Sequence, residues 1–193
     1  MRLATLLMWL VLAPANGMAQ ESSSPSAAGP RVRVVTNVGN FVVELDRGRA
    51  PLTVDAFLKY AKQGFYAGSI FHRVVAGFIA QAGGYTADLQ QKPVSANVPN
   101  ESGNGLSNLR GTVGFARSNE PHSGTSQFYI NLADNLDLNP RPTRWGYAVF
   151  GKVVEGMEVV DDIGHRPTGS GGPFDRNVPI QPLTIERMEV LSE

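Results

Sequence analysis

Cysteine is absent from this chain of 193 residues, which excludes disulfide bonds, thiolate nucleophiles and thiolate metal sites. An excess of charge of either sign is absent too, because 17 Lys and Arg residues balance 17 Asp and Glu residues. No cluster of Lys or Arg marks a basic groove. The sequence therefore favours neither nucleic acid nor an anionic membrane surface as a partner.

Motifs for metal, nucleotide and nucleophilic chemistry are also missing. The histidines His72, His122 and His165 lie far apart, and no pair has the spacing of a helical metal site. No Gly-x-Gly-x-x-Gly motif or P-loop is present, and Ser126 lies outside a Gly-x-Ser-x-Gly elbow. These absences disfavour a metal or nucleotide site, with metal binding through three distant ligands as the minor alternative. A hydrolase site built on His72 and Ser126 is strongly disfavoured.

An apolar run of the length of a signal sequence occurs at the N-terminus. Residues 1–19 combine a positive Arg2, an apolar stretch from Leu3 to Leu12 and small residues at Gly17 and Ala19. This pattern predicts a secretory signal peptide, with cleavage after Ala19 and export of the rest. The alternative is an uncleaved membrane anchor, but the stretch is shorter than the ~20 residues that span a bilayer. We therefore expect no stable membrane insertion after cleavage.

The remainder divides into a lead-in and one domain. Residues 20–30 are polar, small and Pro-containing, which predicts a flexible linker. Residues 31–193 show no internal repeat and no second domain. With 42% hydrophobic and 18% charged residues, the chain has the composition of a globular protein.

Short apolar runs separated by Gly, Pro, Asn and Ser predict a domain that is mainly β. A hairpin is expected around Gly39 and Asn40, and helices over 51–63 and 157–163, the second ended by Gly164. The other expected strands are 70–75, 78–81, 112–116, 127–132, 147–153 and 183–191. Many short strands with two helices indicate an antiparallel barrel or a sandwich. Residues 85–110 and 165–177 are expected to be long loops, which are often functional.

Polar residues inside the apolar runs are the best candidates for a site. Because alternate strand residues share a face, Arg73 is expected beside Phe71, with His72 and Val74 on the other side. By the same rule Gln81 shares a face with Ile79, and Gln127 with Tyr129. Each residue alone has an ordinary structural interpretation, and for His72 a structural, hydrogen-bonded role is favoured. Together the Arg, the two Gln and the aromatics predict one groove.

Four segments carry a resemblance to a known family: residues 71–84 (FHRVVAGFIAQAGG), 111–117 (GTVGFAR), 125–130 (TSQFYI) and 147–153 (YAVFGKV). In this order they resemble the cyclophilins, and the similarity extends over residues 31–193. It is closest to the secreted bacterial members, which share Ala133-Asp134-Asn135 and the Gly-Tyr-Ala-Val-Phe-Gly run. The resemblance implies a bacterial periplasmic location.

The resemblance also implies a fold and an activity. The fold is an eight-stranded antiparallel β-barrel capped by two α-helices, and the activity is peptidyl-prolyl cis-trans isomerisation without a cofactor. The expected partners are unfolded or flexible Pro-containing polypeptides, with the protein acting as a monomer that assists folding of exported proteins. By motif, Arg73 is the catalytic residue. The residues matched to substrate binding are Phe78, Ile79, Gln81, Ala116, Arg117, Gln127, Tyr129, Leu138 and Tyr147.

The sequence departs from the family pattern at a few positions. Ile79 stands where Met is usual, Ala76 where Pro is frequent, and Tyr147 where many eukaryotic members have His. Asp137 falls where cyclosporin-sensitive members have Trp, which puts drug binding in doubt. The alternative function is a non-catalytic module that captures Pro-containing chains, against which the joint presence of Arg73, Phe78 and Gln81 argues.

Overall fold

The structure is a computed structural model that describes residues 29–193. The predicted signal peptide, residues 1–19, and most of the predicted linker, residues 20–30, lie outside the described residues. The first strand begins at Arg31. Pro30, immediately before it, is buried, and its carbonyl accepts a hydrogen bond from the Leu45 backbone N–H at 2.8 Å.

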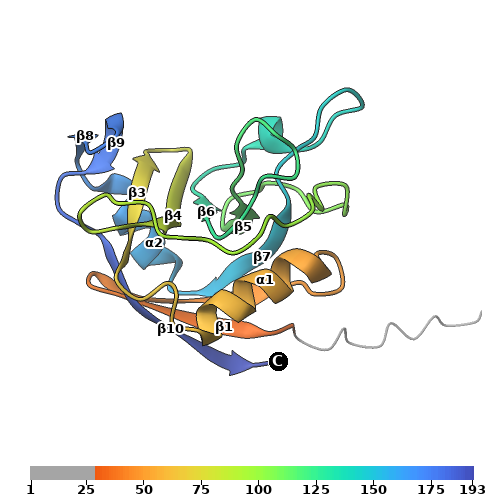
Figure 1. The fold of residues 1–193 in the computed structure, drawn as a ribbon, viewed down its shortest axis with the longest axis horizontal. Coiled ribbons are helices and arrows are strands. Elements are labelled where there is room, and N and C mark those ends of the chain that lie inside the picture. Colours follow the sequence, from red (N-terminus) through yellow and green to blue (C-terminus); the bar gives the residue numbers. More distant parts are fainter. Residues whose placement is uncertain (1–28) are drawn as a thin grey trace, which may run out of the picture.

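Eight antiparallel strands close into a barrel in the order β1-β10-β3-β4-β6-β5-β7-β2 (Figure 1). This confirms the predicted barrel and excludes the sandwich. The strands are β1 (Arg31–Thr36), β2 (Gly39–Leu45), β3 (Ser69–Val75), β4 (Ile79–Thr86), β5 (Thr112–Phe115), β6 (Phe128–Asn131), β7 (Val149–Glu155) and β10 (Thr184–Ser192).

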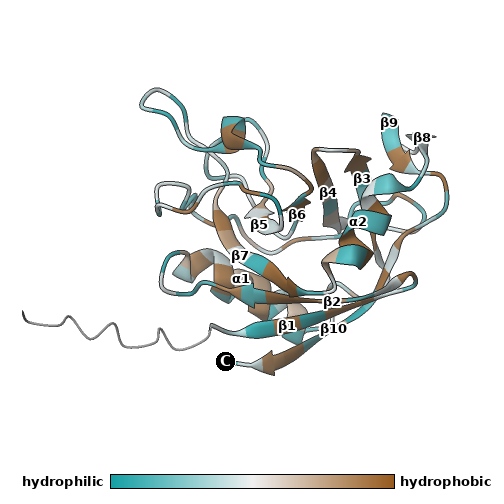
Figure 2. Ribbon diagram, turned by 180° about the vertical axis from the view of Figure 1, so that it is seen from behind, coloured by the Kyte–Doolittle hydropathy of each residue, from teal (hydrophilic) through white to brown (hydrophobic). Residues whose placement is uncertain are grey.

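Two helices lie on opposite sides of the barrel, with α1 (Pro51–Lys62) in front in Figure 1 and α2 (Met157–His165) in front in Figure 2. Pro51 begins α1, as predicted, because its missing N–H has no helical partner to lose. The second helix does not end at Gly164 as expected. Gly164 lies inside α2, where an added Cβ would be 2.8 Å from Leu132 Cδ1, so this glycine serves close packing. No helix in the described part of the chain is long and apolar enough to span a membrane.

Residues 165–177 are not the loop that the sequence predicted. They contribute to a separate hairpin of β8 (Thr168–Gly171) and β9 (Phe174–Pro179), which turns at Gly172 with φ +51°. Its glycines concealed the strand pattern, because Gly-rich segments are ordinarily read as loops. The loop predicted over 85–110 is present over 87–110, because Tyr85 and Thr86 belong to β4. A short 3-10 helix, η1 (Leu136–Leu138), follows β6.

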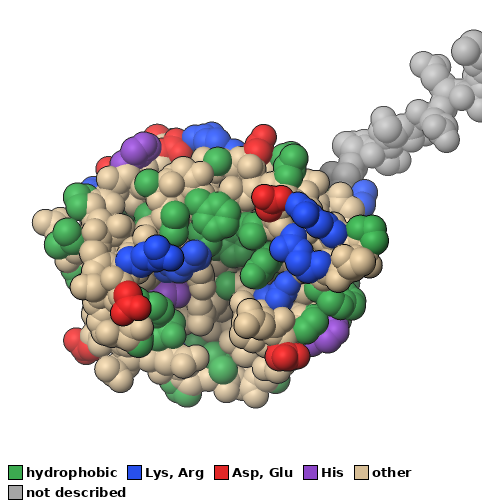
Figure 3. Space-filling view, turned by 90° about the horizontal axis from the view of Figure 1, so that it is seen from above, with side chains coloured by type: hydrophobic (Ala, Val, Ile, Leu, Met, Phe, Trp, Pro, Cys, Tyr) green, Lys and Arg blue, Asp and Glu red, His purple; other side chains and the backbone are tan. Residues whose placement is uncertain are grey.

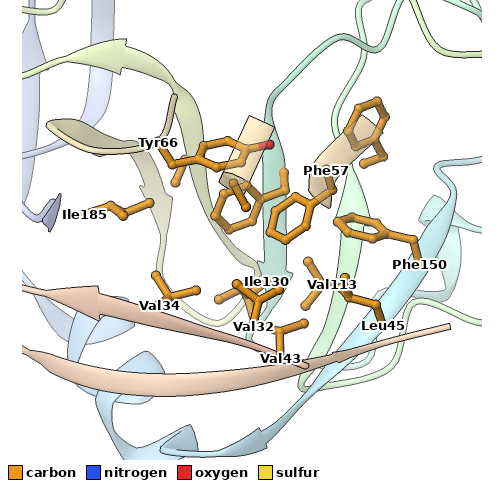
Figure 4. Packing of buried hydrophobic residues seen from close by; sticks show 14 of the residues in the cluster. Val32, Val34, Val43, Leu45, Phe57, Tyr66, Val113, Ile130, Phe150 and Ile185 are labelled. Atoms are coloured by element: carbon orange, nitrogen blue, oxygen red, sulfur yellow. The ribbon is translucent and has the colours of Figure 1, made fainter. Parts of the chain in front are cut away.

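The hydrophobic core fills the barrel interior and extends to the buried face of α1. Phe57 of α1 lies at its centre, with ring centroids 5.3 Å from Tyr66, 5.5 Å from Phe128 and 5.2 Å from Phe150 (Figure 4). Burying side chains of this size contributes about 1.5–3 kcal/mol each. Figure 2 shows hydrophobic colouring on β3 and β4, while the loops above the barrel are mainly hydrophilic. The core thus gives the outer face of β3, β4 and β6 a rigid support.

Candidate active site

A β-bulge in β3 sets the direction of Arg73. Phe71 pairs with Ala82 and Arg73 pairs with Gln81, so two steps along β3 match one step along β4. As a result Phe71 and Val74 both belong to the core. The prediction that Phe71 and Arg73 share a face was therefore wrong, because a bulge inserts one residue and shifts the alternation. Arg73 instead lies on the outer face with Gln81.

Hydrogen bonds join Arg73 to the two predicted glutamines. Arg73 Nη1 donates to Gln81 Oε1 at 3.3 Å, and Gln81 Nε2 donates to Gln127 Oε1 at 2.9 Å. Gly84 leaves room for this arrangement, since an added Cβ there would lie 2.5 Å from Gln127 Cγ. The three side chains form a hydrogen-bonded relay across β3, β4 and the residue directly before β6.

The charge of Arg73 has no acidic partner in the described part of the chain. Among residues 29–193 it forms no salt bridge. Burial lowers the pKa of Arg73 from its ordinary value, and nearby Arg176 lowers it further while Tyr147 opposes the change. An Arg side chain nonetheless stays protonated in proteins. Arg73 therefore offers unneutralised N–H donors at the surface of the site.

A second cluster of apolar side chains, here called the apolar pocket, lies on the same outer face. Ile79, Ala116 and Tyr129 are buried there together, apart from the barrel core. The half-buried side chains packed against them are Phe78, Leu138 and Tyr147. The structure thus brings together six residues that the sequence predicted, from five separate segments of the chain.

Arg117 stands at the edge of this pocket. Its guanidinium lies 4.4 Å from the centroid of the Tyr147 ring. Its Nε donates to the Gly146 carbonyl at 3.2 Å, and its Nη2 to the Trp145 carbonyl at 2.9 Å. Arg117 therefore holds the segment that presents Tyr147, so its donors are largely engaged by the chain itself.

Sequence reasoning missed a buried asparagine behind the pocket. Asn108, in the long 87–110 connection, accepts a hydrogen bond from the Tyr129 hydroxyl at 2.6 Å. Burial raises the pKa of Tyr129 far above its ordinary value, so this phenol is a neutral donor. The only signal in the sequence was the abundance of Asn in that connection, which is too general to identify one residue.

His72 has a structural setting, as the sequence favoured. Its ring is buried between Tyr85 and Phe174, with centroids at 4.5 and 5.6 Å. Burial is the main cause that lowers its pKa to about 4, so the ring is neutral at pH 7. Nδ1 has no hydrogen-bond partner among the described residues. The buried Ser126 hydroxyl donates to the Gly83 carbonyl at 3.0 Å rather than to His72.

Asp137 occupies an exposed position beside the pocket. It lies in η1, directly before Leu138, and its side chain is 90% exposed and paired with Arg141. At the position that the resemblance matches to Trp, this chain therefore has a carboxylate exposed to solvent.

The face that bears the site is hollowed. In Figure 3, which looks down on the top of Figure 1, hydrophobic side chains line a depression between two groups of basic side chains. A different hollow of about 680 Å³, lined by Glu44, Lys152 and Leu109 among others, lies elsewhere and contains none of the predicted site residues. Among residues 29–193, no group of three or more His, Asp or Glu is placed to hold a metal ion.

Comparison with known proteins gives one family. Residues 31–190 match the family described as cyclophilin type peptidyl-prolyl cis-trans isomerase/CLD. The chain is 47% identical over 162 residues to peptidyl-prolyl cis-trans isomerase A of Dickeya dadantii, covering 84% of this chain and 85% of that one. It is 44% identical over 158 residues to isomerase B of Escherichia coli, covering 80% and 96%.

Solved structures agree with this match. A cyclophilin type isomerase of Cryptosporidium parvum has a TM-score of 0.70 and 25% identity, covering 85% of this chain and 98% of that one. The same protein was also solved in the presence of the dipeptide Ala-Pro, with a TM-score of 0.69 and 26% identity, covering 84% and 99%. The match over nearly all of residues 31–193, together with the eight-stranded barrel, shows that this chain belongs to the cyclophilin-type peptidyl-prolyl cis-trans isomerases.

Proposed function

We propose that this isomerase acts outside the cytoplasm on X-Pro bonds of exported polypeptides that are still flexible, with Arg73 as its catalytic residue. The observation that carries the proposal is the placement of Arg73, charged and without an acidic partner among residues 29–193, on the same face as the apolar pocket around Tyr129. Rotation about a prolyl bond requires a charged donor beside an apolar surface that can hold the proline ring.

The barrier to this rotation is electronic. Partial double-bond character of the peptide C–N bond opposes rotation by ~18–20 kcal/mol. At the twisted transition state this resonance is lost, and the prolyl nitrogen becomes pyramidal and regains a lone pair. Arg73 donates an N–H to that lone pair, which the planar ground state lacks. The interaction therefore stabilises the transition state selectively and accelerates both directions equally.

The two glutamines orient the arginine. Gln127 Oε1 accepts from Gln81 Nε2, which turns Gln81 Oε1 toward Arg73. One Nη1 N–H of Arg73 is thus engaged, and the planar guanidinium directs its other donors outward. Gln81 and Gln127 act in this proposal as positioning residues, with surfaces that also border the bound peptide.

The apolar pocket provides the fixed end of the rotation. Phe78, Ile79, Ala116, Tyr129, Leu138 and Tyr147 hold the proline ring by apolar contact. The residue before the proline then turns relative to the anchored ring. No proton is transferred in this scheme, so neither a general base nor a metal is required.

The alternative is a module that captures Pro-containing chains without turnover. The relatives described above are isomerases, which favours turnover. A protease-coupled assay on X-Pro tetrapeptides distinguishes the two, because a catalyst accelerates isomerisation at concentrations far below that of the peptide. A chain that binds peptide but leaves the rate unchanged would support the capture module.

Export is the other part of the proposal, and it is supported by the signal pattern in residues 1–19. Expression of the full chain in a bacterium followed by fractionation and intact-mass analysis tests it. We expect a periplasmic protein that begins at Gln20. A soluble cytoplasmic protein that retains Met1 would exclude export.

A further inference from the structure

We propose that Asn108 is a positioning residue for the isomerase. Through its buried side chain, Asn108 holds the residues that form the pocket in the places needed to bind the substrate proline. This inference rests on the proposed function, because it takes the pocket around Tyr129 as the site of the substrate proline. Asn108 touches no solvent and lies behind the pocket rather than in it. It acts through the residues that it contacts.

Every polar atom of Asn108 is engaged by a segment that borders the pocket. Its Oδ1 accepts from the Tyr129 hydroxyl at 2.6 Å and from Asn131 Nδ2 at 3.2 Å. Its Nδ2 donates to Asn139 Oδ1 at 3.0 Å and to the Tyr147 carbonyl at 3.4 Å. One amide thus joins Tyr129 of β6 to the segment that follows η1 and to the one that precedes β7.

The backbone of Asn108 strengthens the same connections. Its N–H donates to Asn139 Oδ1 at 2.8 Å, and its carbonyl accepts from the Asn135 N–H at 2.8 Å. Both bonds flank Leu138, the pocket residue in η1. The position of Leu138 is therefore tied to Asn108 from both sides along the chain.

A second branch of the network reaches Phe78. Asn131, which donates to Asn108, accepts at its Oδ1 from Asn135 Nδ2 at 2.8 Å. Asn135 Nδ2 also donates to the Phe78 carbonyl at 2.8 Å. Asn108 is thus connected to the turn that presents Phe78 through Asn135, both directly and by way of Asn131, so the network reaches four of the six pocket residues.

The packing of Tyr129 supports this role independently. The ring of Tyr129 lies against Gly114 so closely that an added Cβ would be 2.2 Å from Tyr129 Cζ and 2.3 Å from its hydroxyl. The ring therefore occupies space that only glycine leaves free, and its hydroxyl ends at the acceptor of Asn108. Asparagine suits this place because its amide supplies both an acceptor and donors.

The network predicts a particular kinetic effect. Pocket walls hold the proline ring in the ground state and the transition state alike, so loosening them raises KM with little change in kcat. A purely structural asparagine would behave differently. Its loss would reduce the folded fraction of enzyme, which lowers the apparent kcat and leaves KM unchanged.

The experiment measures KM and kcat of the full mature chain with a Pro-containing tetrapeptide. For Asn108→Ala we expect KM to rise about 10-fold, the effect of one or two lost buried hydrogen bonds. Tyr129→Phe should raise it about 3-fold, since the OH alone is removed. The double variant should equal Asn108→Ala, because the hydroxyl has no acceptor once Asn108 is gone.

Two further variants keep the test decisive. Asn139→Ala removes the acceptor of Asn108 at a half-exposed site, so it provides the test if Asn108→Ala does not fold, with an expected KM about 3-fold higher. Ser69→Ala is the matched control. It removes a buried hydroxyl that donates to the Tyr66 carbonyl at 2.6 Å away from the pocket, and its KM should equal that of the wild type.

Phe78→Ala separates failure of this inference from failure of the proposed function. If Phe78→Ala raises KM while folded Asn108→Ala and Asn139→Ala keep the wild-type KM, the positioning role is wrong and the pocket assignment survives. If Phe78→Ala also leaves KM unchanged, the pocket assignment is overturned and this inference with it.

Discussion

Replacement of Gln81 by Met tests whether the relay orients Arg73. Met has nearly the length and volume of Gln and keeps the packing on β4, but it removes the acceptor of Arg73 Nη1 and the donor to Gln127 Oε1. The bond from Arg73 is long, at 3.3 Å, but charge-assisted. We expect this hydrogen bond to contribute about 1 kcal/mol to holding the Arg73 side chain in place.

If that energy serves to align Arg73, Gln81→Met should lower kcat by about 5-fold. KM should change by less than about 2-fold, because the peptide is held mainly in the pocket. Gln81 is half-buried on the outer face, so we expect a stability loss under about 1 kcal/mol.

The assay is protease-coupled isomerisation of an X-Pro tetrapeptide, paired with thermal unfolding. Gln90→Met provides the control, since Gln90 is exposed in the connection after β4. A folded Gln81→Met enzyme with the wild-type kcat would refute the orienting role. A change confined to KM would assign Gln81 to peptide binding alone.

Three other predictions follow from the site and its surroundings. Gly114→Ala should lower kcat/KM at least 10-fold and destabilise the fold by about 1–3 kcal/mol, because the added Cβ would lie 2.2 Å from Tyr129 Cζ. Near-wild-type kinetics would contradict this, since they would show that the Tyr129 ring can shift without affecting the site. Folding lowers the pKa of His72 from 6.5 to about 4, so in this pH range the unfolded chain binds a proton that the folded chain does not. The free energy of unfolding should therefore decrease as the pH falls from 6.5 toward 4, by up to about 3 kcal/mol. Chemical denaturation of wild type and His72→Phe across this pH range should show a smaller decrease in the free energy of unfolding for the variant. An equal pH dependence in the two proteins would contradict the assignment. Cyclosporin should inhibit weakly, because Asp137 presents an exposed carboxylate beside the pocket, and inhibition at nanomolar drug would refute this.

Local patterns predicted most of the barrel. The hairpin of β1 and β2 was predicted from the runs on either side of Gly39-Asn40, but the chain turns at Asn37-Val38, and Gly39 and Asn40 belong to β2. Helix α1 follows from Pro51 and the helical spacing of its apolar residues. Alternation also placed Gln81 correctly beside Ile79, because β4 continues there without interruption. These features depend only on residues close together in the chain.

The failures share one cause, which is dependence on partners distant in the chain. The bulge at His72 appears only when β3 is paired with β4, so strict alternation assigned Phe71 to the wrong face. The β8–β9 hairpin depends on packing beside β3, where Phe174 meets His72. Asn108 acquires its role from Tyr129 and Asn139, which are 21 and 31 residues away.

The most direct test of the catalytic assignment is kcat/KM of Arg73→Ala. If the guanidinium meets the lone pair of the twisted prolyl nitrogen, kcat/KM should fall by roughly 10²–10³, by analogy with the loss of one oxyanion-hole donor. Peptide affinity should change much less, Arg73→Lys should restore only part of the rate, and the stability loss should stay under ~1–2 kcal/mol. A folded Arg73→Ala enzyme with near-wild-type kcat/KM would contradict the account, and an unfolded one would show that Arg73 is structural.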